Sequence, residues 1–536
     1  ASYKVDPSIG PDMPTLPGLD DGPPRPVGAV EAPDGTRDEF VADEIILRPD
    51  SQAELDAFLA KYGGTVIRDG KARLVPGETP AKGVPADSGW YLIKIDPAKS
   101  PTTDLPSNLS AAGLGGEWVF SNSDAARLSA LALRERSHNI SPNVVAQLSQ
   151  ACDVCEHPTA GGGNLDAADW WWMTEDDNAA VPGEQGLSIG VVHAWDYLKY
   201  QGYPREGVPY VPVKVAVIDT GFDLDTTTGV PLNGNEDYYY SPPKPLQLDE
   251  VDVDWTAGGP GSGFSNCNGC WHGQQTFGVC CSFARNGWGT AGIGNGSEIK
   301  TLLIKVTGDL WVVATGVYNA IYNNAHVINM SITRDCGSWC HTFDNGNVLK
   351  ADVGSARKVG AIVVSAAGNS GKDIGGDDIY PCELPGSICV GAIDQNANAQ
   401  SYSNWGSVVD IFAPAGIRTT VTRPSAAADA NNVDIDELAL FHGTSCSSPY
   451  VAGVVAMMKM LNGNLYHSDV EKILTDTALN SSDTKVSPGY VDAYAAVEAA
   501  KPNKPPTVDI TQPRATWTIG SRLRTRIAGT SRRRPS

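Results

Sequence analysis

Five short segments rich in β-branched residues constrain the fold of this chain more than any other feature. They are separated by helical stretches such as 311–323 and 348–359. The five segments are 213–218, 299–306, 327–331, 361–365 and 388–392. Strands that alternate with helices in this way are typical of a parallel sheet covered by helices on both faces. The sequence therefore predicts an α/β fold from about residue 213 onward.

Polar residues stand where three of these expected strands end. Asp219 directly follows 213–218, Ser331 closes 327–331, and Asn369 follows 361–365 after a short small-residue stretch. Open parallel sheets carry their sites at the carboxyl ends of the strands. We therefore expect these three side chains to meet at one edge of the sheet.

A serine stands at the start of what reads as a buried helix. The turn-forming segment 441–449 contains Ser445 and leads into the apolar run 450–461. A hydroxyl at a helix N-terminus lies beside unpaired N–H groups and the positive end of the helix dipole, which suits a nucleophile. Serine is also a favoured N-cap residue, so the segment alone leaves both interpretations open.

A serine nucleophile needs a base within hydrogen-bond reach and a third group that orients the base. His272 opens a small-residue stretch that could start a helix, and Asp219 at its strand end could orient an imidazole. His442 is constrained by the same tight turn as Ser445, which makes it a poor base.

Four blocks in a fixed order make the pattern specific. They are Val215–Gly221 with Asp-Thr-Gly, His272-Gly273, Ser365–Asn369, and Gly443-Thr-Ser-x-x-x-Pro449. Together they resemble the signature blocks of the subtilisin-like serine proteases, in the order Asp, His, Ser known for subtilisin. The resemblance covers about 187–500 and implies a subtilisin-like peptidase domain there.

The resemblance also implies roles for individual residues. Ser445 would be the nucleophile, His272 the general base, Asp219 its orienting carboxylate, and Asn369 an oxyanion donor. Residues expected to line the substrate are Asn329, Ser331, Ile332, Thr333, Ala366 and Gly368. We expect no cofactor for catalysis and no catalytic metal, while structural calcium stays open because the sequence identifies no ligands.

The chain departs from the family pattern near two of these residues. Gln274-Gln275 follows His272-Gly273, where the family usually has a second histidine. Cys446 and Tyr450 replace commoner residues after the nucleophile. None of these changes removes a member of the expected triad.

A small α+β domain is predicted over 38–120. Ser51 with Glu54 forms a capping-box signature for a helix, and short strands are expected at 44–48, 65–67, 90–95 and 116–120. This domain resembles the inhibitory propeptide of the family, which implies a zymogen with its own intramolecular inhibitor. Residues 1–37 read as a flexible lead and 121–186 as an irregular linker, with an amphipathic segment at 125–136.

The eleven cysteines fall in close groups. They are Cys152/Cys155, Cys267/Cys270, Cys280/Cys281, Cys336/Cys340, Cys382/Cys389 and the single Cys446. Short loops of this kind favour local disulfides in an oxidising compartment. Zinc on the four thiolates between 267 and 281 is the alternative, although adjacent ligands fit usual zinc spacing poorly. The odd number leaves a free thiol, for which Cys446 is our candidate.

The net charge of −22 excludes some partners. An acidic body should repel nucleic acid and anionic membranes. No apolar run long enough to span a bilayer occurs. With the cysteine pattern, the acidic surface favours an extracellular location. The resemblance to the subtilisin-like proteases implies a monomer that acts on protein or peptide substrates. The arginine-rich stretch 501–536 reads as a linker followed by a truncated or disordered tail.

Two other functions compete with a peptidase. A catalytically inactive homologue could act as a binding or scaffold protein, but the intact Asp219, His272, Asn369 and Ser445 argue against it. A zinc-dependent hydrolase would use the cysteines at 267–281, but the sequence has no His-Glu-x-x-His motif.

Overall fold

The large sheet of the computed structural model is parallel throughout, as the alternation of strands and helices predicts. Its strand order is β12-β13-β9-β14-β16-β18-β19, and every neighbouring pair is parallel. The strands are β9 (Val213–Asp219), β12 (Asp249–Asp252), β13 (Ile299–Lys305), β14 (Val327–Met330), β16 (Ile362–Ala366), β18 (Ser387–Ile393) and β19 (Ile411–Pro414). The five predicted strands are confirmed, and no end is shifted by more than one residue.

The structure describes most of the chain up to residue 502. The described ranges are 1–16, 18–19, 22–75, 77–145, 189–203, 212–222, 239–240, 244–245, 249–252, 272–282, 291–294, 299–306, 308–343, 347–375, 379–420 and 438–502. The Cys152/Cys155 and Cys267/Cys270 groups and the predicted tail lie outside the described residues.

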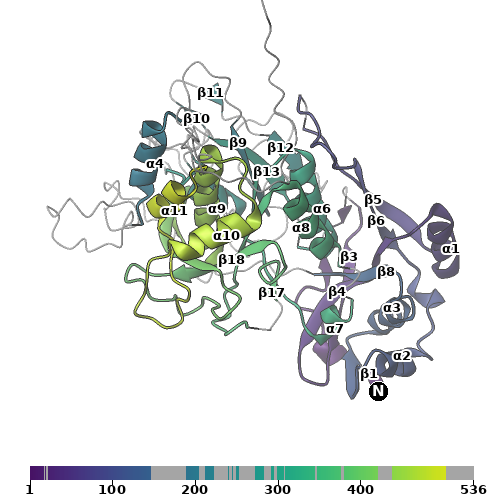
Figure 1. Cartoon of the computed structure of the whole chain (residues 1–536). Helices are drawn as coiled ribbons and strands as arrows, with labels where there is room; N and C mark the ends of the chain where they lie inside the picture. Colours follow the sequence, from purple (N-terminus) through teal and green to yellow (C-terminus); the bar gives the residue numbers. More distant parts are fainter. Residues whose placement is uncertain are drawn as a thin grey trace, which may run out of the picture. The chain divides into compact units, whose positions relative to one another are not determined.

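Helices cover both faces of this sheet (Figure 1). Along β9, Val215 and Val217 belong to one buried cluster, whereas Ala216 and Ile218 belong to the other. The first face packs against α5 (His272–Cys281) and α9 (Thr444–Leu461), while α4 (Val191–Tyr200) and α11 (Ala493–Ala499) pack in turn against α9. The second face packs against α6 (Leu310–Tyr322) and α8 (Val348–Val359). Successive side chains of a strand point to opposite faces of the sheet. Because both faces are covered by helices, the strands are apolar on both sides.

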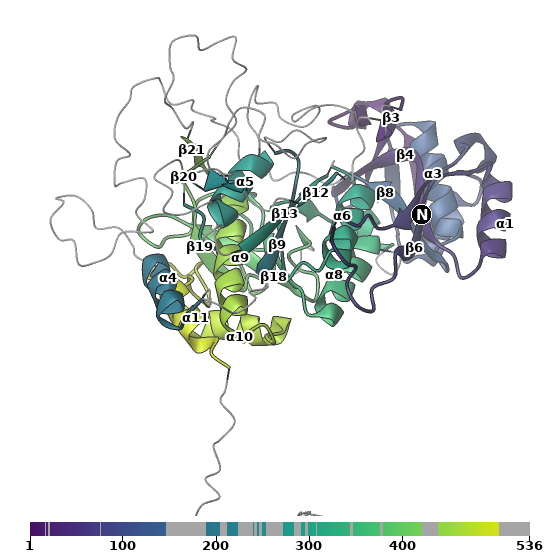
Figure 2. The ribbon, with the colours of Figure 1, turned by 90° about the horizontal axis from the view of Figure 1, so that it is seen from above.

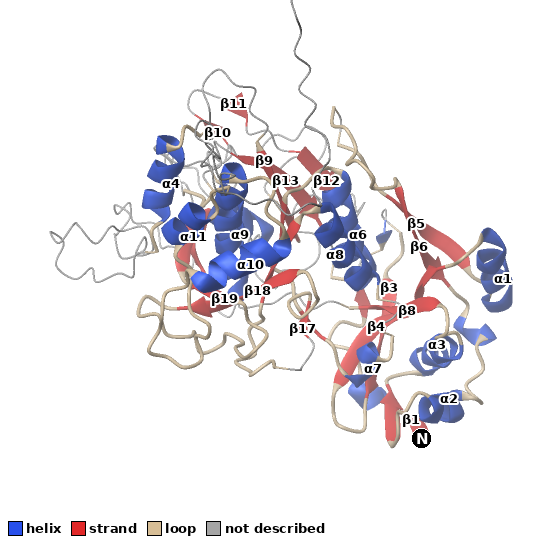
Figure 3. Cartoon of the chain, in the orientation of Figure 1, coloured by secondary structure: helices blue, strands red, loops and turns tan. Residues whose placement is uncertain are grey.

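The remaining elements of the large module, residues 189–502, lie outside the large sheet, and Figure 3 labels β10, β11, β17, α7 and α10 among them. They are β10 (Tyr239–Tyr240), β11 (Lys244–Pro245), β15 (Arg334–Asp335), β17 (Ile379–Tyr380), β20 (Ile417–Thr420), β21 (Leu438–Phe441), α7 (Ser338–His341) and α10 (His467–Asp476).

The N-terminal module, residues 1–145, is a second, mixed sheet with its own helices. Its sheet runs β1-β7-β3-β4-β6-β5, with β2 paired to β3 and β8 to β4. The elements are β1 (Ser2–Val5), η1 (Pro7–Ile9), β2 (Thr15–Leu16), β3 (Arg25–Glu31), β4 (Arg37–Arg48), α1 (Gln52–Tyr62), β5 (Thr65–Lys71), β6 (Asp87–Lys94), η3 (Pro97–Lys99), α2 (Leu105–Ala111), β7 (Glu117–Phe120), α3 (Ser123–Arg134) and β8 (Asn139–Val144). Ser51 caps α1 by accepting from the Glu54 N–H, while the Glu54 carboxylate accepts from the N–H of Asp50 rather than of Ser51.

The structure corrects two expectations about this module. Residues 1–37 are not a flexible lead, because β1 and β3 belong to the sheet and pair with β7. The segment 121–186 is regular at its start, where it forms α3 and β8. Residues 1–37 are rich in proline, glycine and aspartate, and their partner strand β7 lies 115 residues beyond β1 and 90 beyond β3. Local composition therefore carried no signal for this pairing.

The two modules share one buried core. Side chains of β3, β4, β7 and α3 form a continuous apolar cluster with side chains of α6 and α8. Figure 2 shows α6 and α8 on the side of the large sheet that faces the N-terminal strands. Residues 1–501 accordingly behave as one compact unit.

A buried polar network crosses this shared core at the start of α6. Arg25 pairs with Asp309 at 2.7 Å and with Glu44 at 3.2 Å. Asp309 caps α6 by accepting from the Val312 N–H. Asn143 donates to Glu44 at 2.7 Å. All four charged or amide side chains of this network are buried, so each depends on the others for its partners.

None of the helices in the described part of the chain combines the length and apolarity that a bilayer crossing requires.

We predict that the free energy of unfolding decreases as the pH rises, because the buried Glu44 carboxyl loses its proton. Burial, with Asp309 nearby, raises the Glu44 pKa to about 7 from its ordinary 4.5. Because the folded protein binds this proton more tightly than the unfolded chain, Glu44 contributes its full stabilisation below pH 4.5. The contribution is lost as the pH rises from 4.5 through about 7. The loss should reach about 3 kcal/mol, because one pKa unit corresponds to about 1.4 kcal/mol.

Urea unfolding of the full chain at pH 5 and pH 8 measures this effect. Other buried carboxyls also titrate, so Glu44→Gln is compared with the parent, both carrying Ser445→Ala to suppress self-digestion. The difference between the two proteins should change with pH. An equal pH dependence in both would show that Glu44 does not titrate in this range.

Candidate active site

Asp219 and His272 are hydrogen bonded at the carboxyl edge of the large sheet. Asp219 is the last residue of β9 and is fully buried, and His272 is the first residue of α5. The His272 Nδ1 lies 2.7 Å from Asp219 Oδ1. Asp219 also accepts from the Thr220 N–H at 2.7 Å and from Thr276 Oγ1 at 3.1 Å. The carboxylate is therefore held on both oxygens and orients the imidazole ring.

The far nitrogen of His272 is available. Its Nε2 is buried and has no hydrogen-bond partner among the described residues. The ring also meets Phe441 edge-on, with centroids 5.4 Å apart. A neutral imidazole whose Nδ1 carries the proton shared with a carboxylate presents Nε2 as an acceptor. This arrangement prepares His272 to take a proton.

Gly273 lets α5 approach β9 closely enough for this contact. A Cβ at this position would lie 2.4 Å from the Gly221 carbonyl oxygen and 3.0 Å from the Asp219 Cβ. Real Cβ atoms do not approach a carbonyl oxygen this closely. Position 273 therefore requires a glycine, because any larger residue would clash with the Gly221 carbonyl.

Ser445 is the second residue of α9, and Gly443 occupies the N-cap position. The simple cap interpretation of Ser445 is therefore wrong. Its Oγ lies 3.2 Å from the Ser331 carbonyl oxygen, while Ser331 Oγ donates to the Ser445 carbonyl at 3.0 Å. Helices α5 and α9 pack against each other. His272 and Ser445 thus both stand at the N-terminal ends of two packed helices.

Asn369 is oriented by the residue before the serine. Its Oδ1 accepts from the Thr444 N–H at 2.8 Å and from Thr444 Oγ1 at 3.0 Å. Its Nδ2 is buried and has no partner among the described residues. With its acceptor occupied, the amide of Asn369 presents a donor that nothing in the described structure uses.

The residues expected to line the substrate divide into two groups. Asn329 is fully buried, and its side-chain amide donates to Ser331 Oγ at 3.0 Å, a contact within the protein. The strand expected over 327–331 ends one residue earlier, because β14 stops at Met330. Ile332 and Thr333 follow it, and both are buried.

Ala366 and Gly368 lie at and just after the end of β16, the strand next to β14. Ala366 ends β16. The Gly368 N–H donates to Thr444 Oγ1 at 3.0 Å, which ties this stretch to the start of α9. A substrate contact by any of the six residues stays a prediction.

Sequence reasoning missed three supporting residues. Thr276 holds Asp219, Thr444 holds Asn369, and the Tyr402 hydroxyl accepts from the Gly443 N–H at 2.9 Å. Thr444 lies inside the Gly-Thr-Ser block and could have been found there. Tyr402 is distant in the sequence, so nothing local indicated its contact.

The cysteines follow the disulfide expectation in the described part of the chain. Cys280–Cys281, Cys336–Cys340 and Cys382–Cys389 are disulfides. Cys446 is a buried free thiol among the described cysteines, as expected. Burial raises the pKa of Cys446 to about 12, so the thiol stays protonated and unreactive. Within the described residues, no cluster of His, Cys, Asp or Glu side chains could hold a metal ion.

Comparison with known proteins identifies the family. The model of the subtilase family matches residues 212–497, more than half of the chain. The chain belongs to the subtilase family. Subtilisin Savinase of Lederbergia lenta is 30% identical over 288 residues, which cover 53% of this chain and 90% of that protein. M-protease of Shouchella clausii (strain KSM-K16) is 31% identical over 288 residues, covering 53% of this chain and 64% of M-protease.

The similarity has two limits. The chain spans 64% of the length of M-protease and also of the alkaline elastase YaB of Bacillus sp. (strain YaB), to which it is 29% identical over 53% of this chain. The structure of fervidolysin from Fervidobacterium pennivorans matches with a TM-score of 0.53 at 18% identity, covering 86% of this chain and 62% of that one. At this identity the structural match supports the subtilase fold alone.

We predict opposite effects for two helical glycines. Gly273→Ala should destabilise the chain by about 1–3 kcal/mol, because its Cβ overlaps the Gly221 carbonyl. Gly354→Ala in α8 has open space around its Cβ and should stabilise by about 0.5–1 kcal/mol. Urea unfolding of both variants in a Ser445→Ala background measures the difference. An equal change in the free energy of unfolding for the two substitutions would contradict the steric role of Gly273.

Proposed function

We propose that this subtilase is a secreted serine endopeptidase that uses Asp219, His272 and Ser445 as its triad. The observation that supports this most is the 2.7 Å hydrogen bond from His272 Nδ1 to buried Asp219, with His272 Nε2 left without a partner among the described residues. An imidazole fixed through one nitrogen and open at the other is what a serine nucleophile needs as its base.

The reaction would proceed through an acyl-enzyme. Ser445 Oγ attacks the scissile carbonyl carbon as His272 Nε2 takes the hydroxyl proton. The imidazolium, stabilised by the Asp219 carboxylate, then donates this proton to the leaving amine nitrogen as the peptide C–N bond breaks. A water attacks the ester in the second half, with His272 again as base, and releases the acid and free Ser445.

Asn369 would stabilise the negative charge that develops on the carbonyl oxygen. Its Nδ2 has no partner among the described residues, and its orientation is set by Thr444 through the Oδ1 contacts. The Ser445 N–H at the start of α9 would be the second donor, assisted by the helix dipole. Donors fixed before the reaction need no reorganisation in the transition state.

The substrates would be proteins or peptides bound in an extended conformation beside residues 331–333. The N-terminal module would serve as the intramolecular inhibitor of a zymogen, in keeping with its packing against α6 and α8. The three described disulfides are consistent with an extracellular location. We propose a monomer that needs no cofactor for catalysis, with structural calcium left as an open addition.

Active-site labelling tests this function directly. A fluorophosphonate probe should form a covalent adduct with Ser445, located by peptide mapping, and Ser445→Ala should remove the adduct. An inactive homologue that acts as a scaffold would bind partners without labelling. Absence of the adduct in protein that has been cut between the two modules, within residues 146–188, would reject the peptidase function.

We predict that Asn369→Ala lowers kcat about 10²–10³-fold on a peptide substrate, the magnitude known for the corresponding loss in subtilisin itself. KM should change little, since the donor acts on charge that develops only in the transition state. Thr444→Val, which removes one of the two contacts that orient Asn369, should give a smaller loss in kcat. Steady-state kinetics measures both, and a change confined to KM would contradict an oxyanion role.

A further inference from the structure

The loop that carries Asn369 is exposed at its tip and is held from beneath by a second segment. This oxyanion loop, residues 367–372, follows β16, and Ser370 and Lys372 within it are exposed. The second segment, residues 401–405, lies between β18 and β19, and its Asn404 is only 1% exposed. We call it the clamp segment. An exposed loop does not by itself fix a hydrogen-bond donor, so the position of Asn369 depends on what holds the loop.

We propose that Asn404 is a positioning residue for the oxyanion donor, because it holds the backbone on both sides of Asn369. Tyr402 of the same segment would hold the start of α9. The clamp segment would then set the separation of the two proposed donors, Asn369 Nδ2 and the Ser445 N–H. The effect on catalysis rests on the proposed peptidase function, whereas the hold on the loop does not.

Asn404 directs its side-chain oxygen, its side-chain nitrogen and its backbone N–H at the oxyanion loop. The Oδ1 accepts from the N–H groups of Ser370 and Lys372 at 3.1 and 3.0 Å. The Nδ2 donates to the Ala367 carbonyl at 2.8 Å. The backbone N–H donates to the Gly368 carbonyl at 2.9 Å. These four bonds reach the loop both before and after the proposed oxyanion donor.

The chemistry of these contacts matches an asparagine. A side-chain amide offers an acceptor with two lone pairs and a donor on neighbouring atoms. These groups meet two N–H groups and one carbonyl of the oxyanion loop. A carboxylate would place an acceptor against the Ala367 carbonyl, and an apolar side chain would offer the loop no hydrogen bond at all. Position 404 therefore serves the loop through its amide and not only through its volume.

Two glycines of the oxyanion loop permit the close approach of the clamp segment. Gly368 has a φ of +95°, and a Cβ there would lie 2.6 Å from Asn404 Nδ2. Gly371 has a φ of +65°, and a Cβ there would lie 2.8 Å from the Ser401 carbonyl oxygen. Its N–H donates to the Tyr402 carbonyl at 2.7 Å. Both positions favour glycine because of the left-handed backbone and because of the contact with the clamp segment.

The clamp segment is itself bonded to the large sheet. Ser403 is 1% exposed, and its Oγ accepts from the Ala392 N–H on β18 at 2.9 Å. The same hydroxyl donates to the Asn404 carbonyl at 2.9 Å. Strand β18 lies next to β16, which leads into the oxyanion loop. The loop is therefore connected to the sheet twice, through β16 along the chain and through the clamp segment from the neighbouring strand.

Tyr402 connects the clamp segment to the helix that carries the nucleophile. Its hydroxyl accepts from the N–H of Gly443, two residues before Ser445, at 2.9 Å. The clamp segment thus bonds the oxyanion loop through Asn404 and the start of α9 through Tyr402. Oxyanion stabilisation depends on donors that are fixed before the reaction. One segment that bonds both donor-bearing parts supplies this requirement.

Hydrogen exchange tests the hold on the loop without any catalytic activity. In the full chain carrying Ser445→Ala, Asn404→Ala should speed deuterium uptake at 370 and 372 about fivefold or more, because two N–H groups lose their acceptor. Asn404→Ser removes the amide donor and retains a shorter polar group, so it provides the test if Asn404→Ala does not fold. Exchange at the parental rate in these variants would overturn the proposal.

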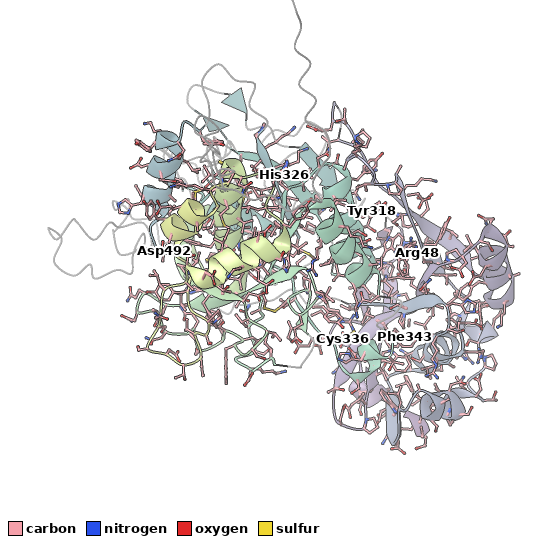
Figure 4. All side chains as sticks on the ribbon, in the orientation of Figure 1. Arg48, Tyr318, His326, Cys336, Phe343 and Asp492 are labelled. Carbon is pink, nitrogen blue, oxygen red and sulfur yellow. A yellow bond between two sulfur atoms is a disulfide. The ribbon has the colours of Figure 1, made fainter. Side chains whose placement is uncertain are left out.

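A helix cap far from the loop in the sequence provides the matched control. Asp492 caps α11 by accepting from the Ala495 N–H at 2.8 Å, and Figure 4 labels it. Asp492→Ala also removes a side-chain acceptor from a backbone N–H. It should speed exchange at the start of α11 and leave positions 370 and 372 unchanged. Faster exchange at 370 and 372 in this control as well would attribute the effect to lower global stability and reject a specific hold by Asn404.

A double-mutant cycle tests whether Asn404 acts through Asn369. In protein cut between the two modules, Asn404→Ala should lower kcat on a peptide substrate about tenfold or more, because a small misplacement of a catalytic group is costly. KM should change less than kcat. In an Asn369→Ala background the same substitution should lower kcat by no more than about twofold, since the donor is already absent. Equal losses in both backgrounds would reject Asn404 as a positioning residue for Asn369.

Two further variants separate positioning from stability and from the peptidase function. Asp492→Ala should lower the urea midpoint while kcat stays within about twofold, whereas Tyr402→Phe should lower kcat about threefold or more. An unchanged kcat in Tyr402→Phe would reject the role of its hydroxyl. Fluorophosphonate labelling of the parent reports the proposed peptidase function. A parent that fails to label would reject that function, and hydrogen exchange would then decide the hold on the loop by itself.

Discussion

The buried helix α9 is the element on which the rest of the site depends. All residues from Thr444 to Leu461 are buried, and the helix lies against β14, β16, β18 and β19. Its N-terminus reaches the carboxyl edge of the sheet, so Ser445 is placed by core packing rather than by a surface loop. A nucleophile on such a helix cannot shift without repacking the centre of the module.

The other end of α9 is fixed by a buried amine. Lys459 Nζ donates to the carbonyls of Gly360, Gly463 and Leu465 at 3.0, 3.3 and 2.7 Å. These carbonyls follow the C-terminal ends of α8 and α9, where the helix dipoles favour a cation. Burial lowers the Lys459 pKa to about 8, which still leaves most of the amine protonated at neutral pH. The protonated Lys459 amine therefore links the C-terminal ends of α8 and α9 through these carbonyls.

The sequence was sufficient to predict the parallel sheet, because β-branched segments buried on both faces carry a strong local signal. The approach of Asp219 to His272 was predicted from strand ends and family blocks, and the hydrogen bond agrees with it. Contacts that depend on distant pairing were not predictable. Strand β1 was missed because its partner β7 lies 115 residues further along the chain. The role of Tyr402 was missed because a hydroxyl that accepts from a turn N–H leaves no sequence pattern.

The two halves of the site are held by different parts of the structure. His272 and Asp219 are fixed by the close approach of α5 to β9, where Thr276 and Thr220 hold the carboxylate. Ser445 and Asn369 are fixed through Thr444 at the start of α9. The two pairs meet through the packing of α5 on α9 and the contact of Phe441 with His272. The base and the oxyanion donor are therefore oriented by different neighbours, Asp219 with its threonine contacts for His272 and Thr444 for Asn369.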